Sequence, residues 1–264
     1  MTSSADLREL LESVAAGELA PALAEAQLGG YVTGEAGRFD AAREHRTGIP
    51  EAILGDGKTT PEIVSLASDA FEAAGHVLIT RIDPPVVDAV RESIEPTDPA
   101  ARFDHDERAR VLTVHGSAFA APELDGAVGV VTGGTSDAGP AGEAAAVIAE
   151  MGIRVHRTED VGVAGLARTI DALPSLREMD ALVVAAGREG ALPTVLAGLV
   201  DVPIIGLPVS NGYGHGGAGE AALLGMLQSC TTIAVVNIDA GFVAGAQAGL
   251  IARGVARERE AGDR

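Results

Sequence analysis

Residues 126–160, GAVGVVTGGTSDAGPAGEAAAVIAEMGIRVHRTED, contain the pattern that decides the fold. The uninterrupted apolar run at 126–134 predicts a buried strand that ends in glycines. The segment at 136–152 predicts a helix with Ser136 as its N-cap, and the segment at 153–160 predicts the next strand. A strand, a helix and a second strand in this order are the unit from which parallel sheets are built.

The same alternation continues to the C-terminus. Val- and Ile-rich strands that alternate with helices are typical of a parallel, doubly wound sheet with helices on both faces, a three-layer α/β sandwich. Ligands bind such sheets at the carboxyl ends of the strands. Strands are expected at 180–187, 202–209 and 233–238, and helices at 163–176 (where Pro174 breaks the helix), 191–200, 217–230 and 239–253.

The N-terminal part has a weaker version of this pattern. A helical segment is expected at 1–28, ended by the two glycines at 29–30, and a polar loop at 31–50. Two domains follow from these patterns, a smaller α/β region of uncertain fold at 1–120 and a larger doubly wound α/β domain at 121–264. Within the first, strands are expected at 51–54, 76–80 and 110–116, helices at 61–75 and 84–94, and a turn at 103–109.

The composition excludes several classes of partner. The 264 residues carry a formal net charge of -19, which repels nucleic acid and anionic membranes. Aromatic residues make up only 3% and Trp is absent, which argues against stacking on nucleic-acid bases. With a single cysteine, Cys230, the chain forms no internal disulfide and no cysteine-rich zinc site.

Two segments bear on localisation. The first residues, MTSSADLREL, lack the basic and apolar regions of a signal peptide. The apolar stretch at 221–238 is long enough to raise the question of a membrane span, but polar residues such as Gln228 and Asn237 interrupt it. We interpret it as a buried helix followed by a buried strand, and we expect a soluble, cytoplasmic protein.

The predicted strand ends carry loops that are suited to chemistry. In TGGTSDAGPAGE (132–143), the glycines allow close approach of a ligand, and Asp137 is suited to accept hydrogen bonds from ribose. In AAGREGALP (185–193), Arg188 and Glu189 form an anion clamp beside a base. An ordinary helix cap and an ordinary charged pair at a helix start explain these two loops equally well.

Other loops favour simpler interpretations. In HRTEDVGVAG (156–165), Asp160 fits a solvated turn, and the glycines of PVSNGYGHGGAGEA (208–221) fit either a lid or a phosphate cradle. GDGKTT (55–60) lacks the first glycine of a P-loop, so Lys58 is expected at the surface. Cys230 ends the predicted helix, where the helix dipole does not lower a thiol pKa, so the residue alone favours a buried, inert thiol.

These loops resemble those of the aminoimidazole ribonucleotide carboxylase (PurE) family. TGGTSD (132–137), AAGREGALP (185–193) and IIGLPVS (204–210) match its nucleotide loop, its Ala-Gly loop and one of its strands. The resemblance implies a PurE-like, flavodoxin-like or Rossmann-like fold from about 126 to 253. One departure matters, because the catalytic His of the purine enzymes is replaced by the sequence at 159–162, which contains no His.

A closer resemblance, to the LarB family of nickel-pincer nucleotide cofactor biosynthesis, covers about 51 to 245. It implies an enzyme that carboxylates carbon 5 of the pyridinium ring of nicotinic acid adenine dinucleotide and hydrolyses its phosphoanhydride. The products implied are pyridinium-3,5-biscarboxylic acid mononucleotide and AMP. The matching stretches are GDGKT, TGGTSDAGPAGEA, TEDVGVAG, GREGALP, PVSNGYG and LLGMLQSC followed by AVVNIDAGF.

This resemblance assigns roles to residues. Cys230 matches the cysteine that forms an adduct with the ring, and Glu189 matches the acidic residue that is a candidate base. Carbon dioxide or bicarbonate is the expected co-substrate, and magnesium or another divalent cation is an expected cofactor with unknown ligands. The expected substrate-binding residues are Gly133, Gly134, Thr135, Ser136, Asp137, Asp160, Arg188, Ser210, Asn211, Gly212 and Tyr213.

Three questions stay open at this point. A purine-pathway carboxylase or mutase is the alternative enzyme, and a non-catalytic nucleotide-binding sensor is the alternative from another class. A homo-oligomer is expected, an octamer by analogy with the PurE fold. In that assembly, the apolar helix at 239–253 is expected to pack against another subunit.

Overall fold

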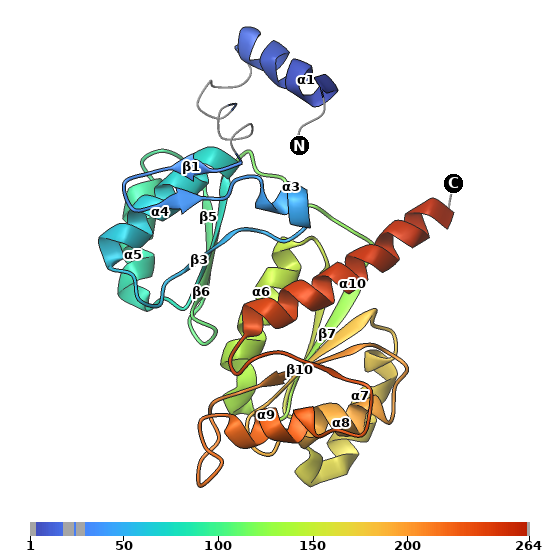
Figure 1. Ribbon diagram of the computed structural model, residues 1–264. Helices are drawn as coiled ribbons and strands as arrows, with labels where there is room; N and C mark the ends of the chain where they lie inside the picture. The colour runs from blue at the N-terminus through green and yellow to red at the C-terminus, as the bar shows by residue number, and fades with distance from the viewer. Residues whose placement is uncertain (1–3, 18–23, 25–29, 263–264) are drawn as a thin grey trace. The chain divides into compact units, whose positions relative to one another are not determined.

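Each half of the chain builds its own sheet in the computed structural model, which describes residues 4–17, 24 and 30–262 (Figure 1). The first unit comprises residues up to 105 together with 112–120, and the second comprises 106–111 and 121–264. Among the described residues, no helix combines the length and the apolar character needed to cross a membrane.

The second unit is organised around a five-stranded parallel sheet, which confirms the predicted α/β fold class. The strand order is β11-β10-β9-β7-β8, and all four neighbour pairs run parallel. Because all strands point the same way, the loops that follow them meet at one edge of the sheet. The strands are β7 (Ala127–Thr132), β8 (Arg154–Thr158), β9 (Ala181–Ala186), β10 (Ile204–Pro208) and β11 (Ala234–Val235).

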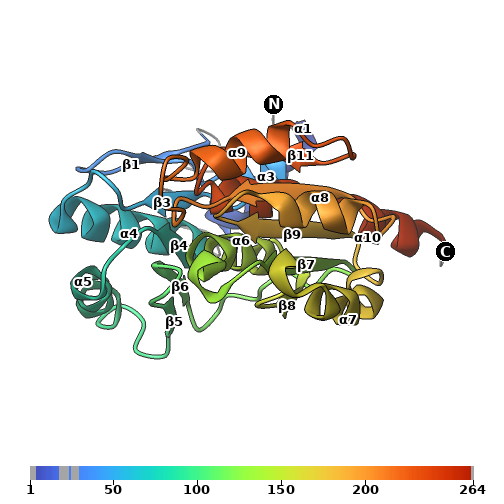
Figure 2. The same ribbon diagram turned by 90° about the horizontal axis from the view of Figure 1, so that it is seen from below.

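Helices cover both faces of this sheet (Figures 1 and 2). On one face, α7, α8 and α9 share a buried cluster with the β9 side chains Leu182 and Val184. On the other, α6 and α10 pack against each other so closely that Gly245 lies against the backbone of Ala144. The helices are α6 (Ala138–Glu150), α7 (Leu166–Leu176), α8 (Ala191–Ala197), α9 (Glu220–Leu227) and α10 (Gly241–Gly262), with 3-10 turns at Thr135–Asp137 and Val163–Gly165.

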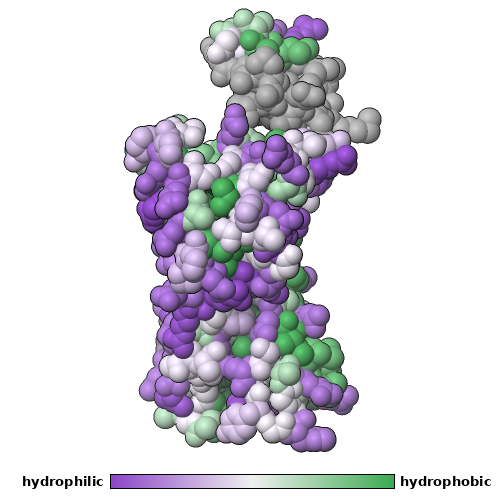
Figure 3. All heavy atoms as spheres, turned by 90° about the vertical axis from the view of Figure 1, so that its left-hand side faces the viewer, coloured by the Kyte–Doolittle hydropathy of each residue, from purple (hydrophilic) through white to green (hydrophobic). Residues whose placement is uncertain are grey.

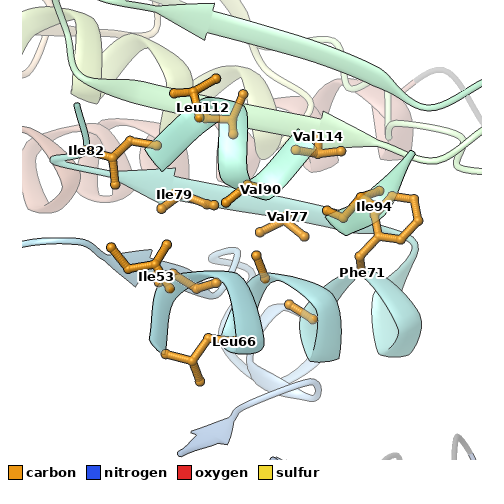
Figure 4. Close-up of a cluster of buried hydrophobic side chains, with 14 of the residues drawn as sticks. Ile53, Leu66, Phe71, Val77, Ile79, Ile82, Val90, Ile94, Leu112 and Val114 are labelled. Carbon is orange, nitrogen blue, oxygen red and sulfur yellow. The ribbon is translucent and has the colours of Figure 1, made fainter. Parts of the chain in front are cut away.

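The first unit contains a four-stranded sheet of order β3-β4-β6-β5, in which β3 and β4 are parallel. Its core is formed by apolar side chains of the sheet, α4 and α5, including Leu66, Val90 and Leu112 (Figure 4). The elements are β3 (Ala52–Leu54), α4 (Thr60–Ala74), β4 (His76–Thr80), α5 (Pro84–Ile94), β5 (Arg102–Asp106) and β6 (Val111–His115).

The structure corrects the predictions for the N-terminal part. The segment at 31–50 is not a loop, because it contains β1 (Val32–Thr33), β2 (Arg38–Phe39) and α3 (Arg43–Thr47). Residues 103–109 were expected as a turn, but most of them belong to β5, an edge strand that tolerates polar side chains. The N-terminal helix, α1, spans only Ser4–Ala15, and most of 18–29 lies outside the described residues.

Three predictions for the second unit are also wrong in detail. Ser136 does not cap α6, because a 3-10 turn precedes the helix and Asp137 occupies the N-cap position. Pro174 lies inside α7 without breaking it. The segment at 221–238 is not buried throughout, since Leu224 and Leu227 are exposed. The small residues of α10 pack on α6 of the same chain, and packing of this helix on another subunit stays a prediction.

The surface agrees with the high net charge. On the face shown in Figure 3, hydrophilic side chains cover most of the surface and hydrophobic ones form separate patches. Exposed apolar residues of the second unit include Leu166 and Ile170 on α7 and Leu224 and Leu227 on α9.

Candidate active site

Four loops follow the strands at the carboxyl edge of the second unit's sheet. We call them the first loop (133–137, after β7), the second loop (159–165, after β8), the third loop (187–190, after β9) and the fourth loop (209–219, after β10). All the residues with expected binding roles lie in these loops. Cys230 lies elsewhere, beyond α9.

The first, third and fourth loops are joined by one buried carboxylate, that of Asp137, which is only 5% exposed. Its Oδ2 atom accepts a hydrogen bond from the backbone N–H of Gly134 at 2.9 Å, and its Oδ1 atom accepts one from Nδ2 of Asn211 at 2.7 Å. The backbone N–H groups of Gly133 and Gly187 lie near enough to the same carboxylate to favour its charged form. The loops are therefore held together by a charged group at their centre.

This arrangement has consequences for Asp137 itself. Burial raises the pKa of the Asp137 carboxyl above its ordinary value, and the hydrogen bonds from Asn211, Gly134, Gly187 and Gly133 act in the opposite direction. The carboxylate oxygens already have protein donors. The expected contact of Asp137 with ribose therefore stays a prediction, while its role as a link between loops is a feature of the structure.

The loops approach so closely that a side chain is not tolerated at Gly187. A Cβ atom there would lie 1.6 Å from Oδ1 of Asn211 and 3.0 Å from Oδ1 of Asp137. Gly212 packs in turn on the carbonyl oxygen of Gly187, where a Cβ would come within 2.4 Å. Glycine is thus required where the third and fourth loops cross.

Charged and aromatic side chains project from the loops that Asp137 joins. Arg188 and Glu189 are both exposed on the third loop. The guanidinium carbon Cζ of Arg188 lies 4.1 Å from the ring centroid of Tyr213, on the fourth loop. Thr135 and Ser136 are exposed on the first loop. The site therefore offers hydroxyls, a cation, a carboxylate and an aromatic face at one edge of the sheet.

Sequence reasoning missed one residue that fixes the fourth loop, Asp239. It lies between β11 and α10, and its Oδ1 atom accepts a hydrogen bond from the backbone N–H of Ser210 at 2.9 Å. Its own N–H donates to the carbonyl of Pro208 at 2.9 Å, and its φ is a positive 54°. The signal in the sequence that could have indicated this role is the position of an acidic residue, Asp239, shortly after the strand β11.

The second loop is fixed differently. Asp160 has a φ of 58°, its N–H donates to Oγ1 of Thr132 at 3.3 Å, and its carboxylate pairs with Nη1 of Arg168 at 2.5 Å. A small pocket beside this loop is lined by Thr132, Arg157, Glu159 and residues of α6. The structure thus joins the Asp160 side chain to Arg168, whereas the Asp137 carboxylate is bonded to Gly134 and Asn211.

Cys230 is exposed, so the expectation that the thiol is buried is wrong. It lies three residues beyond the end of α9 and not at the end of the helix itself. A Cβ at Gly225 of α9 would lie 2.2 Å from the carbonyl oxygen of Glu189, so α9 packs directly on the third loop. Oγ1 of Thr194, on α8, donates to Oγ of Ser229 at 2.9 Å, which fastens the segment before Cys230 to the helix that follows Glu189.

The comparisons with known proteins agree with this division of the chain. Residues 31–116 match the LarB/PurE-like N-terminal domain, and residues 127–261 match the AIR carboxylase domain. An uncharacterized protein of Methanocaldococcus jannaschii, MJ0165, is 38% identical over 221 residues, which cover 82% of this chain and 84% of that protein. The chain belongs to the LarB/PurE-like family.

Family membership indicates a carboxylase-type enzyme, and the match to the AIR carboxylase domain covers the second unit's sheet. All four loops lie within that match. The second loop contains the carboxylates Glu159 and Asp160 and no His. Glu189, the exposed carboxylate of the third loop, is the candidate base.

Proposed function

We propose that this LarB/PurE-like protein carboxylates carbon 5 of the pyridinium ring of nicotinic acid adenine dinucleotide and hydrolyses the phosphoanhydride. The products are pyridinium-3,5-biscarboxylic acid mononucleotide and AMP, on the route to a nickel-pincer cofactor. The observation that carries the proposal is the exposed thiol of Cys230, in a segment fastened to α8, the helix that begins directly after Glu189 and Gly190.

A thiolate solves the central problem of this reaction. A pyridinium ring is electron-poor, so its carbon 5 does not attack carbon dioxide. Addition of the Cys230 thiolate at carbon 4 forms a C–S bond and converts the ring to a neutral dihydropyridine. Its N1–C6=C5 unit is an enamine, in which carbon 5 is nucleophilic.

The remaining steps return the thiolate. Carbon 5 attacks carbon dioxide, a C–C bond forms, and the ring nitrogen becomes an iminium. Glu189 then removes the proton from carbon 5 as a general base, which restores the enamine. Expulsion of the sulfur from carbon 4 regenerates the aromatic pyridinium and the thiolate. The net change at carbon 5 is replacement of a proton by a carboxylate.

Hydrolysis of the phosphoanhydride requires charge neutralisation beside the phosphates. Arg188 on the third loop supplies it, and the exposed hydroxyls of Thr135 and Ser136 on the first loop offer hydrogen-bond donors. Among the described residues, no group of three or more His, Cys, Asp or Glu side chains is arranged to hold a metal ion. A magnesium ion would therefore be held mainly by the substrate phosphates, and no step here passes through it.

The proposal is tested by mass spectrometry of products. Wild-type protein is incubated with nicotinic acid adenine dinucleotide, bicarbonate and magnesium, and the dicarboxylated mononucleotide and AMP are expected. Cys230→Ser keeps the size of the side chain but removes the nucleophile, so the variant is expected to bind substrate and to form no dicarboxylated product. Gln228→Ala, which changes an exposed side chain near Cys230 and keeps both the thiol and the Thr194–Ser229 hydrogen bond, is the control.

Two results contradict the proposal. Absence of the dicarboxylated product from wild type would overturn the reaction. A folded Cys230→Ser protein that carboxylates at the wild-type rate would overturn the covalent step. A dihydropyridine-like absorbance in the wild type that is absent from the Ser variant would support it.

A purine-pathway carboxylase is the second candidate, because residues 127–261 match the AIR carboxylase domain. Its catalytic His is absent from the second loop, which reads Glu159, Asp160, Val161, Gly162. Conversion of aminoimidazole ribonucleotide by the purified protein would favour this candidate over the first.

We also propose that the protein is a homo-oligomer, an octamer by analogy with the PurE fold. Leu224 and Leu227 on α9, with Val243 and Leu250 on α10, leave apolar side chains exposed on helices that flank the sheet. Light scattering in ample salt is expected to give a mass well above the 26.6 kDa of one chain, since salt screens the repulsion between acidic subunits. A monomer under these conditions would contradict the assembly.

A further inference from the structure

A planar cation occupies one face of Tyr213. The guanidinium of Arg188 stacks there, with Cζ 4.1 Å from the ring centroid. This lies within the distance of about 6 Å at which a cation is attracted to the electron-rich face of an aromatic ring. The two residues come from different loops, so the stack joins the third loop to the fourth.

The stack is exposed and therefore replaceable. Tyr213 is 76% exposed, and Arg188 is exposed as well. A cation–π pair in water is weak, and it strengthens when it is shielded from solvent. A ligand that carries its own planar cation and shields the ring has the advantage over the guanidinium.

Tyr213 is also the single Phe, Tyr or Trp in the four loops. A ligand ring that stacks on a Phe, Tyr or Trp side chain of these loops must therefore use it, and the imidazole of His215 is the other aromatic ring of the fourth loop. Glycines flank Tyr213 on both sides, which lets the ring reorient. Two carboxylates, exposed Glu189 and buried Asp137, lie on loops of the same cluster and favour a cationic ring over a neutral one.

We propose that the face of Tyr213 is the platform for the cationic ring of the ligand, which takes the place of Arg188. Arg188, once displaced, turns to the phosphates of the same ligand. Tyr213 thereby makes the site selective for a planar aromatic cation. The inference rests on the proposed function, which supplies a pyridinium substrate, and it deepens that function by naming the residue that recognises ring charge.

Two ligands that differ in ring charge provide the test. Oxidised nicotinamide adenine dinucleotide carries a pyridinium, and the reduced form carries a neutral dihydropyridine on the same phosphates. Calorimetry of both ligands gives the preference for the charged ring. Wild-type protein is expected to prefer the oxidised form, and Tyr213→Leu is expected to reduce this preference about five- to thirtyfold.

Two variants keep the test specific. Tyr213→Phe retains the aromatic face and is expected to retain the preference. Tyr31→Leu removes a comparable stack in the first unit, where Cζ of Arg38 lies 4.9 Å from the Tyr31 ring, and is expected to change nothing. Because Tyr213 is largely exposed, its replacement is not expected to unfold the protein.

The outcomes separate this inference from the proposed function. If Tyr213→Leu keeps the full preference, or if wild type binds neither ligand, the platform is refuted. If carboxylation occurs but the preference is independent of Tyr213, the reaction stands and the inference fails. If the preference depends on Tyr213 but no carboxylated product forms, the inference stands and the proposed reaction fails.

Discussion

The carboxyl edges of the two sheets carry similar glycine-rich sequences and use them differently. After β3, Nζ of Lys58 donates to the carbonyl of Leu54 at 2.7 Å, and Arg81 pairs with Asp56 at 3.4 Å. After β9, Arg188 stacks on an exposed ring and Glu189 projects into solvent. At the first edge, Lys58 and Arg81 bind a backbone carbonyl and a carboxylate of the protein itself. At the second edge, Arg188 and Glu189 are exposed and available to a ligand.

The difference lies in which residues hold each edge together. Lys58 contacts a residue four positions away, so the first edge includes a contact within one loop. Asp137 contacts Asn211, which is 74 positions away, so the second edge is joined across three loops. Because these long-range hydrogen bonds hold the loops where they leave the sheet, the exposed side chains at the loop tips are free to bind a ligand. The predictions below test this contrast, from the largest expected effect to the smallest.

Replacement of the proposed base should have the largest effect. Glu189→Gln keeps the shape of the side chain but removes the proton acceptor, and loss of a general base lowers the rate by about 10²- to 10⁴-fold. Single-turnover kinetics should therefore show slow product formation with near-normal substrate affinity. Glu178→Gln is the control, because this exposed residue precedes β9 and so lies at the opposite edge of the sheet. Equal rates for both variants would remove Glu189 from the chemistry.

The Asp137 link should come next in size. Asp137→Asn replaces two of the acceptor sites of a buried carboxylate by an amide donor, so the loops lose hydrogen bonds worth about 1–3 kcal/mol in the free energy of unfolding. Hydrogen exchange of the amides in 133–137 and 209–213 should accelerate. The exposed Asp56→Asn in the first unit, which breaks a surface pair, should cost about 1 kcal/mol or less. Unchanged exchange in Asp137→Asn would contradict the role of this residue as a link.

The same carboxylate predicts a pH dependence of smaller size. Burial raises the pKa of Asp137 in the folded protein above its ordinary value of 3.8. Folding then favours the protonated form, so this contribution to stability is fully present below the unfolded pKa and is lost as pH rises through the folded pKa. Urea midpoints of wild type and Asp137→Asn, compared through the acid range above 3.8, should converge as pH rises. A constant difference would contradict the raised pKa.

Local patterns predicted much of the fold. The predicted bounds of β4 and α5 agree with the structure, because Gly75 stops α4 and Pro84 starts α5. The pattern failed at β5, whose polar residues RFDHD lie on an edge strand that has one neighbour and little burial. Edge strands carry weak hydrophobic alternation, so their sequence resembles that of a turn.

The candidate site was predicted less completely, for a different reason. Its loops were placed correctly from the strand ends, but the bonds between them depend on contacts over long sequence distances. Nothing near Asp137 in the sequence indicates Asn211, and nothing near Ser210 indicates Asp239. The exposure of Cys230 depends on where α9 ends, at Leu227, and ends of helices are the least reliable part of a sequence prediction.

Replacement of the first unit's strand-end cation should have the smallest effect. Lys58→Gln removes a charged donor from the carbonyl of Leu54, but the side chain is exposed and water replaces it, so the loss should be about 0.5–1 kcal/mol of stability at most. Affinity for the dinucleotide and the rate of carboxylation should not change. Arg188→Gln is the matched replacement at the second edge and should weaken dinucleotide binding while leaving stability unchanged. If Lys58→Gln weakened binding as much as Arg188→Gln, the first edge would be part of the ligand site and the contrast between the two edges would be wrong.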